Sequence, residues 1–330
     1  MNVLVVGYGS MGRRRIRLYK QLDKNAEFIC VDSNSERIKQ IKDDGHIAYA
    51  DLKEAIKENP DYAFVCTSPL SHAAIIPILL KNKINTFTEI NLSSKNYDEM
   101  IQLAKENDVK LFLSSTMIYK KQIQKIKELV QKEVQPLTYI YHIGQYLPDW
   151  HPWESYKDFF IGKKESNGCR EIYAIQLPWI IDTFGEVERV NKTSHKTTKL
   201  EIDYDDSYIT TFEHKNGSKG VFVVDIVSRV ATTYLEIIGE NLHITWDGSN
   251  DGLKIYNINE RKVERFMAYE NLEHNEKYAA NIVENTYLDE IKDFVSFILN
   301  GTEPKWSIQK DYYVLGLIDK IEGGDNTILF

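Results

Sequence analysis

The sequence predicts two domains of different class: an α/β domain with a doubly wound parallel sheet over residues 1–117, and an α+β domain with a large open, mainly antiparallel sheet over residues 118–330. Three observations support this division. Up to about residue 117, short apolar runs alternate with segments of helical period. Beyond it, strands of alternating apolar and polar residues come in pairs joined by tight turns. The 330 residues, 42% of them hydrophobic, suffice for two cores.

The first half alternates strand-like and helix-like segments with short connections, which is typical of parallel βαβ units. Its apolar runs are continuous, as expected of strands buried on both faces, and they are Val3–Val6, Phe28–Val31, Tyr62–Cys66, Ile84–Phe87 and Lys110–Leu113. The expected helices are Met11–Leu22, Ser35–Lys42, Leu52–Glu58, Ser71–Lys81 and Asn96–Asn107. Right-handed crossovers then give an open sheet with helices on both faces.

The second half begins with a predicted helix at about Lys120–Lys132. Asn216 and Gly217 give a strong hairpin signal, because both turn positions need a positive φ. The expected strands are Leu137–Gln145, Ser207–His214, Lys219–Ser228, Tyr234–Ile238, Leu242–Trp246 and Leu253–Ile258, and the expected helices are Glu171–Phe184, Tyr287–Leu299 and Ile308–Ile321.

Composition narrows the function classes. A net charge of −8 argues against binding to nucleic acid or to anionic membranes, and no apolar run approaches the roughly 20 residues of a membrane span. The N-terminal "MNVLVVGYG" enters a glycine turn directly, so we expect no signal peptide. The cysteines, three in number, predict reduced thiols and a cytoplasmic location. No Cys or His pair has the spacing of zinc ligands, so no metal site is expected.

The motif "GYGSMG" follows the first strand and opens the first helix, which predicts a dinucleotide site. Gly7 permits the tight turn, Gly9 lets the backbone approach a pyrophosphate, and Gly12 lets helix and strand pack closely. The helix start, with Ser10 and Met11, then directs backbone N–H groups at the phosphates. Asp32, twenty residues after Gly12, would bind the adenosine ribose and favour NAD over NADP. The alternative is a glycine turn without a ligand.

The cluster "RRRIR", Arg13–Arg17, opposes the helix macrodipole, so one arginine, most plausibly Arg13, could reach a phosphate. A solvated helix face is the favoured alternative. Arg37 could accommodate the 2′-phosphate of NADP, which keeps the cofactor preference open.

The stretch "CTSPLSHAAIIPILLKNKINTFTEINL" resembles the glucose–fructose oxidoreductase/inositol dehydrogenase (Gfo/Idh/MocA) family. In that family a fourth strand ends in Thr-x-Pro-x-x-x-His-like residues and a fifth ends in Glu-Lys-Pro. Here Thr67, Pro69 and His72 match the first pattern and Glu89 matches the glutamate. The resemblance spans essentially the whole chain. It implies a Rossmann domain, a second domain whose sheet forms an oligomer interface, and NAD(P)-dependent hydride transfer at a sugar, cyclitol or related carbon.

The family's cofactor contacts line up with Gly7, Gly9, Gly12, Asp32, Thr67, Pro69, His72 and Glu89. The full set of residues expected to bind the cofactor also includes Ser10, Met11, Arg13, Arg37 and Ser68. For His72 an equally good alternative is a residue at the start of a helix that packs against the loop.

The family's proton-handling positions do not match. Its lysine after the glutamate is Ile90 here, and its proline is Asn91. Its second helix carries an acid and, about four residues later, a histidine. This chain has Glu171 at the acid position and Ile175, beside Gln176, at the histidine position. An isoleucine cannot move a proton, so the acid/base group is either relocated or lost.

The stretch "YLPDWHPWESYKDFF", residues 146–160, is the predicted substrate loop. Its aromatic residues offer faces for a sugar ring, and its polar residues offer hydrogen bonds. The predicted catalytic residues are His151, Tyr173 and Glu171, and the predicted substrate-binding residues are Tyr146, Asp149, Trp150, Trp153 and Gln176. Two alternatives are a purely structural aromatic loop and an ion pair between Arg170 and Glu171.

Three functions follow. The first is an NAD-dependent oxidoreductase on a sugar or nucleotide-sugar with a relocated acid/base group. The second is a catalytically degenerate protein that keeps the cofactor and binds or senses a sugar. The third is an enzyme that uses tightly bound NAD transiently, as an epimerase or glycosidase. By family analogy we expect a homodimer or homotetramer that associates through the second sheet.

Overall fold

The computed structural model describes residues 1–151, 154–269, 283–323 and 327–329. The chain forms two compact units. The first consists of Met1–Ser115 and Tyr287–Tyr313, and the second of Thr116–Thr286 and Val314–Phe330. The observed division after Ser115 is close to the predicted one after residue 117. The structure differs in that the later segment Tyr287–Tyr313 belongs to the first unit.

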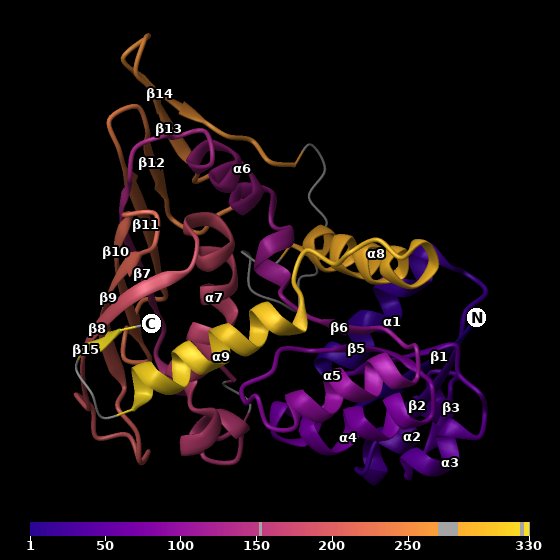
Figure 1. The fold of residues 1–330 in the computed structure, drawn as a ribbon. Helices are drawn as coiled ribbons and strands as arrows, with labels where there is room; N and C mark the ends of the chain where they lie inside the picture. The colour runs from indigo at the N-terminus through magenta and orange to yellow at the C-terminus, as the bar shows by residue number, and fades with distance from the viewer. Residues whose placement is uncertain (152–153, 270–282, 324–326, 330) are drawn as a thin grey trace. The chain divides into compact units, whose positions relative to one another are not determined.

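The first unit is built on a six-stranded sheet in the order β3-β2-β1-β4-β5-β6 (Figure 1). All its neighbouring strands are parallel. The strands are β1 (Asn2–Val6), β2 (Glu27–Val31), β3 (Ile47–Tyr49), β4 (Tyr62–Val65), β5 (Asn85–Thr88) and β6 (Leu111–Leu113). After β3 the chain crosses to the other side of β1, where it forms β4, β5 and β6. In such sheets ligands bind at the switch point, which here lies between β1 and β4. The predicted doubly wound α/β class is confirmed.

Helices pack on the sheet of the first unit through aromatic side chains. Phe294 of α8 contacts Tyr62, Phe64, Phe87 and Phe112, and Tyr19 of α1 contacts the same Tyr62 and Phe64. Helices α1 and α8 therefore share one face of the sheet. The helices of this unit are α1 (Ser10–Leu22), α2 (Ser35–Asp43), α3 (Leu52–Ile56), α4 (Pro69–Lys81), α5 (Tyr97–Glu106) and α8 (Glu284–Asn300), which enters the unit at Tyr287.

The second unit is built on a nine-stranded sheet in the order β14-β13-β12-β11-β7-β10-β9-β8-β15. Among the strand pairs of the described residues, only β7–β10 is parallel. The strands are β7 (Thr138–Gly144), β8 (Val187–His195), β9 (Ser207–His214), β10 (Lys219–Asp225), β11 (Thr232–Ile238), β12 (His243–Trp246), β13 (Lys254–Asn257), β14 (Lys262–Arg265) and β15 (Thr327–Leu329). The predicted large, mainly antiparallel sheet is confirmed.

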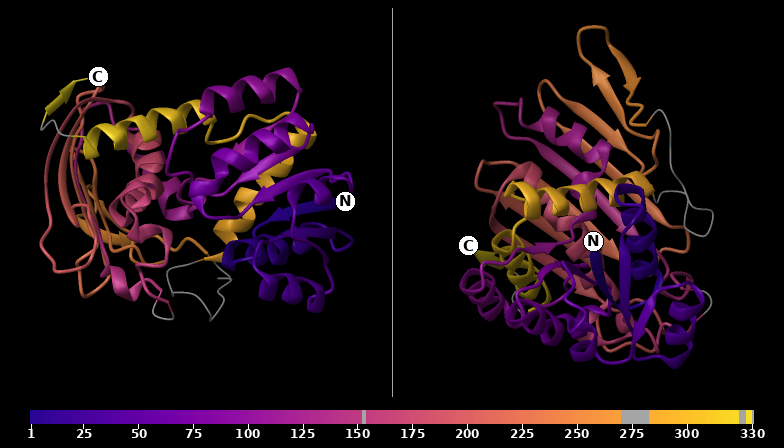
Figure 2. Two further views of the ribbon diagram at one scale, coloured as in Figure 1. Left: turned by 90° about the horizontal axis from the view of Figure 1, so that it is seen from below. Right: turned by 90° about the vertical axis from the view of Figure 1, so that its right-hand side faces the viewer.

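Helix α7 (Gly168–Phe184) lies along one face of this sheet (Figures 1 and 2). Phe184 stacks on Tyr139 and Trp179 meets Tyr141 edge-on, so alternate residues of β7 point toward the helix. The residues between them face the other way, and Ile140 is 38% exposed. The remaining helices are η1 (Thr116–Tyr119), α6 (Lys121–Val130), η2 (Leu147–Asp149), η3 (Phe160–Gly162), η4 (Lys164–Ser166) and α9 (Ile308–Glu322), of which the part from Val314 belongs to this unit.

Candidate functional site

The loop after β1 requires glycine at two of its three motif positions. Gly7 has a φ of +98°, and a Cβ there would lie 2.8 Å from the carbonyl group of Cys66. A Cβ on Gly12 would lie 2.1 Å from the carbonyl oxygen of Gly7. The position of Gly9 is different, because the nearest atom to its Cβ would be an Arg37 nitrogen at 3.9 Å. The loop is thus closed against β4 and α1, while the backbone at Gly9 remains open to a ligand.

Helix α1 begins directly after Gly9, with Ser10 and Met11 as its first residues. The N-cap residue, Gly9, makes no side-chain cap hydrogen bond, and the first turn of the helix has no acidic residue. Backbone N–H groups at a helix start attract anions. This end of α1 therefore fits a pyrophosphate, which is the part of NAD that the glycine motif predicts there.

Asp32 directly follows β2 and is 7% exposed. Its carboxylate accepts hydrogen bonds from the backbone N–H of Tyr8 at 2.8 Å and of Asn34 at 2.9 Å. Arg37 Nη1 lies 3.4 Å from the same carboxylate. This fixed carboxylate fits the diol of an adenosine ribose. The Nη1 of Arg13 donates to the Tyr8 carbonyl, next to the loop at the start of α1, and to Gln40.

The end of β4 is held together by its own side chains. Ser71 Oγ donates to Thr67 Oγ1 at 2.7 Å, Ser68 is the N-cap of α4, and Pro69 is the first residue of that helix. His72 is 1% exposed, and its ring nitrogens lie 2.8 Å from Asn91 Oδ1 and 3.1 Å from the Thr67 carbonyl. Burial lowers the pKa of His72, so the ring is neutral. His72 can thus reach a cofactor only indirectly, through the backbone of Thr67.

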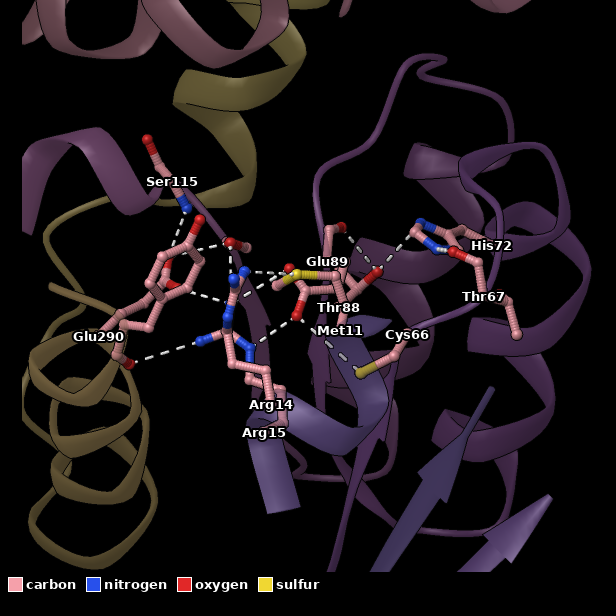
Figure 3. A network of polar contacts seen from close by, with 12 residues as sticks. Met11, Arg14, Arg15, Cys66, Thr67, His72, Thr88, Glu89, Ser115 and Glu290 are labelled. Atoms are coloured by element: carbon pink, nitrogen blue, oxygen red, sulfur yellow. Dashed lines mark hydrogen bonds and ion pairs between the residues drawn. The ribbon is translucent and has the colours of Figure 1, made fainter. Parts of the chain in front are cut away.

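Glu89 directly follows β5 and forms a two-pronged pair with Arg15 (Figure 3). Arg15 Nε donates to one carboxylate oxygen at 2.6 Å, and Nη2 donates to the other at 3.1 Å. Nη2 also donates to Glu290 of α8 at 2.8 Å. Burial opposes the charge on Arg15, but the two carboxylates together raise its pKa above the ordinary value. Glu89 is therefore an ionic partner of Arg15 in this structure.

The favoured interpretation of Arg13–Arg17 as a solvated helix face was wrong for two of its residues. Arg14 is 3% exposed and Arg15 is fully buried. Arg14 lies over the ring of Tyr287, and Arg15 lies over the ring of Phe87. The available signal was Glu89, since a carboxylate at the end of a buried strand needs a cation. Glu290 gave no such signal, because it lies 275 residues along the chain from Arg15.

In the second unit, Glu171 lies in the first turn of α7. The partly exposed residues of this helix are Glu171, Ile175 and Asp182, which share one stripe at helical spacing. Within the described part of the chain, no side chain bonds or pairs with the Glu171 carboxylate. Burial raises its pKa to about 7. A carboxyl group with such a pKa can take or give a proton at neutral pH.

The residues near Glu171 that were also predicted to act in the site bond to or pair with other residues of the second unit. Arg170 pairs with Asp319 and Glu322 of α9, so the suggested ion pair with Glu171 does not form. Tyr173 is fully buried, and its hydroxyl lies 2.6 Å from Thr210 Oγ1 on β9. Burial raises the pKa of Tyr173 well above its ordinary value, which makes it a poor base. Gln176 Oε1 accepts hydrogen bonds from Tyr141 and Trp179 in the core.

The predicted substrate loop packs on the start of α7. Trp150 donates its indole N–H to the Gln145 carbonyl, and a Cβ on Gly168 would lie 3.5 Å from the Trp150 ring. His151 Nδ1 lies 2.7 Å from Glu154, and its ring packs on Phe159. Asp149 is in the short helix η2, and the guanidinium of Arg229 lies 3.6 Å from the Tyr146 ring centre. Trp153 lies outside the described residues.

Two further properties concern the described residues alone. They contain no group of three His, Cys, Asp or Glu side chains arranged to hold a metal ion. Among them, the helices are all too short or too polar to cross a membrane.

The glycine loop, the start of α1 and Asp32 define a dinucleotide-binding domain of the Rossmann class. Comparison with known sequences is more specific. A model of the oxidoreductase family with an NAD-binding Rossmann fold, Gfo/Idh/MocA, matches residues 1–115. Residues 1–115 are thus similar to that family, and the resemblance drawn from the sequence is confirmed.

Individual proteins of known sequence or structure are also similar to this chain. The myo-inositol 2-dehydrogenase of Thermotoga maritima is 28% identical over 136 residues, which are 40% of this chain and 41% of that protein. An Agrobacterium radiobacter oxidoreductase, solved with NAD+, L-tartaric acid and magnesium, is 16% identical with a TM-score of 0.85 over 100% of this chain and 98% of that one. A levoglucosan dehydrogenase with NADH and L-sorbose is 15% identical with a TM-score of 0.81 over 97% and 95%. The two structures show that the fold is shared along the whole chain.

Proposed function

We propose that this protein is an NAD-dependent oxidoreductase that oxidises a secondary hydroxyl of a sugar or nucleotide-sugar, with Glu171 as its acid/base group. The observation that supports this most is the state of Glu171, which is partly exposed, has no pairing side chain among the described residues and has a pKa of about 7. It stands in a chain whose first unit fits NAD. The names of the relatives, which include an inositol and a levoglucosan dehydrogenase, support the substrate class.

The chemistry divides between cofactor and protein. Bound NAD would supply the hydride acceptor, so that the C–H bond of the substrate carbon breaks with both its electrons leaving as hydride. Glu171 accepts the proton of the hydroxyl, so that a carbonyl forms and charge is balanced. The dinucleotide would be held by Asp32, by the start of α1 and by the strand ends at Thr67 and Glu89. A base matched to the working pH contributes about 10²- to 10⁴-fold to the rate of such a step.

Substrate contacts are proposed on the loop that packs on the start of α7. Tyr146, Asp149 and Trp150 offer a ring face and hydrogen bonds of the kind that sugars need, and Trp153 belongs to the same stretch. His151 is the second choice for the base, since it is one third exposed and paired with Glu154. We do not assign Tyr173 or Gln176 to the reaction. The Tyr173 hydroxyl bonds to Thr210, and Gln176 Oε1 already accepts hydrogen bonds from Tyr141 and Trp179.

The decisive experiment is turnover with the purified protein. Each member of a panel of cyclitols, monosaccharides and nucleotide-sugars is incubated with NAD, and NADH absorbance is followed with NADP in parallel. Steady NADH formation with one substrate, lost in Glu171→Gln, is the expected result. NADH formation that survives Glu171→Gln but not His151→Ala would move the base to His151.

A catalytically degenerate protein that binds NAD and a sugar is the second candidate function. The observation in its favour is that Ile90 and Ile175 stand where the family has proton-handling residues. Tight NAD binding without turnover across the whole panel would support it. An enzyme that uses NAD transiently would differ again, because cofactor would co-purify and the substrate would change without net NADH.

We also propose that the protein self-associates through the open face of the second sheet. Ile209, Val223, His142 and Tyr234 form one row across β9, β10, β7 and β11 on the face away from α7. Ile209 is 44% exposed and Tyr234 is 42% exposed. Exposed apolar sheet faces of this kind mark association surfaces. Three free, buried cysteines support a reducing, cytoplasmic location.

A further inference from the structure

Arg15 is a fully buried arginine between two buried carboxylates. Its exposure is 0%, that of Glu290 is 0% and that of Glu89 is 8%. Removing such charges from water is costly, and buried ion pairs are weak contributors to stability compared with apolar packing. Stability alone therefore does not explain this network well, and its position in the fold suggests a function.

The network lies at the carboxyl ends of neighbouring strands in the parallel sheet. Glu89 follows β5, and Ser114 and Ser115 follow β6. In the sheet order, β2, which Asp32 follows, lies on one side of β1 and its glycine loop, and β5, which Glu89 follows, lies on the other. Since Asp32 marks the adenosine end of the crevice, β4, β5 and β6 lie on the nicotinamide side. Glu89 is thus a carboxylate on the nicotinamide half of the site.

The orientation of the Glu89 carboxylate is determined by contacts on Arg15. Both its oxygens accept from the guanidinium, which sets the carboxylate in the plane of the fork. The guanidinium is oriented in turn by Glu290, whose other oxygen accepts from the Ser115 backbone N–H at 2.7 Å and from Ser114 Oγ at 3.0 Å (Figure 3). The centre of the Phe87 ring lies 4.4 Å from the guanidinium carbon of Arg15. A chain of contacts therefore runs from α8 through α1 to the end of β5.

We propose that Arg15 is a positioning residue for the nicotinamide half of the dinucleotide. It acts by holding the Glu89 carboxylate as a fixed hydrogen-bond acceptor at the end of β5, and Glu290 holds Arg15 in place. The proposal depends on NAD binding in the first unit, which is part of the proposed function, and does not depend on the substrate or on Glu171.

The test compares two ligands that share the adenosine and pyrophosphate but differ at the other end. Dissociation constants for NAD and for ADP-ribose, which lacks nicotinamide, are measured by calorimetry on the wild type and on Arg15→Lys. Lysine keeps the charge but cannot form the two-pronged pair. NAD affinity should fall about tenfold or more, while ADP-ribose affinity stays within about twofold. Glu290→Gln should shift the same ratio in the same direction by a smaller factor.

Arg170→Lys is the matched control, because Arg170 is also a buried arginine with two carboxylate partners but belongs to the second unit. It should leave the ratio of the two dissociation constants unchanged. An equal loss for both ligands in Arg15→Lys, or no loss for either, would overturn the proposal. If Arg15→Lys does not fold, Glu290→Gln decides by the same ratio. A wild type that binds NAD but oxidises no sugar would contradict the proposed catalysis while leaving this test intact.

Discussion

The Tyr97 hydroxyl donates a 2.5 Å hydrogen bond to the carboxylate of Asp311, which lies 214 residues further along the chain. The Trp306 indole N–H donates to the other oxygen at 3.0 Å. Burial raises the pKa of Asp311 to about 6, although both hydrogen bonds act in the opposite direction. The first unit therefore carries a carboxyl group that is easier to bury protonated than ionised.

This relationship predicts a pH-dependent stability. Since the folded-state pKa of Asp311 is above the unfolded value, its ionisation costs stability as the pH rises from about 4 to about 6, and the whole cost is present above that. Relative to the wild type, Asp311→Asn should gain roughly 3 kcal/mol in unfolding free energy over this window. Urea unfolding of both proteins at several pH values measures the difference. A difference that does not vary with pH would contradict the assignment.

Glu171→Gln should lower the rate of sugar oxidation by about 10²- to 10⁴-fold, because the amide cannot accept the hydroxyl proton. The wild-type rate should rise as the pH passes about 7, where the carboxyl group loses its proton, and this limb should vanish in the variant. Stopped-flow or steady-state kinetics across pH, with NAD affinity as the second readout, check both points. Tyr173→Phe is the matched control, and it should lower the melting temperature while keeping the pH limb. A full rate in Glu171→Gln would exclude this residue as the base.

Two glycine substitutions should distinguish an effect on the stability of the fold from an effect on NAD binding. Gly12→Ala should cost about 1–3 kcal/mol of stability, because the new methyl group would meet backbone at Gly7. Gly9→Ala should change stability by less than about 0.5 kcal/mol but weaken NAD, since its methyl group would extend into the approach path of the phosphates. Thermal unfolding and NAD titration measure the two effects. Gly316→Ala, in an open position of α9, is the control and should leave NAD affinity unchanged. Unchanged NAD affinity in Gly9→Ala would argue against a pyrophosphate at this loop.

Asp32→Asn should shift cofactor preference toward NADP. The amide still accepts from the Tyr8 backbone N–H, but its neutral charge no longer repels a 2′-phosphate and no longer pairs with Arg37. We expect the ratio of the NADP to NAD dissociation constants to fall by about tenfold. Fluorescence titration of both reduced cofactors measures it. Asp44→Asn, which alters the partner of the Tyr8 hydroxyl, should not shift the ratio.

Ile209→Glu should shift the protein toward monomers if the open sheet face is the association surface. A charge in place of an apolar side chain that association would bury is strongly unfavourable. Light scattering after size exclusion measures the mass. Val134→Glu is the control, because Val134 is 92% exposed and lies outside the sheet. A wild type that is already monomeric would contradict the proposed surface, as would an Ile209→Glu variant with unchanged mass.

Much of the fold could be predicted because it depends on local patterns. Strands β1, β2, β4 and β6 are mainly apolar, and right-handed crossovers between parallel strands predict an open, doubly wound sheet. Strand β3 was not predicted, since Ile47–Tyr49 is short and Ile47 is 43% exposed. Strand β8, Val187–His195, was missed because most of its residues are polar; pairing with β9 defines it. Strand β10 ends at Asp225 and not at Ser228, because the Asp225 carboxylate accepts the N–H groups of the next turn.

By itself, the sequence determined the glycine loop, the placing of Asp32 after the second strand and the family, because backbone conformation and strand periodicity are properties of neighbouring residues. Only the tertiary structure decided that Arg15 is buried between Glu89 and Glu290. It also decided that Arg170 pairs with α9, and that Glu171 has no pairing side chain among the residues that the structure describes. The physical reason is that the ionic state of a side chain depends on which distant groups share its burial, and those partners come together only when the chain has folded.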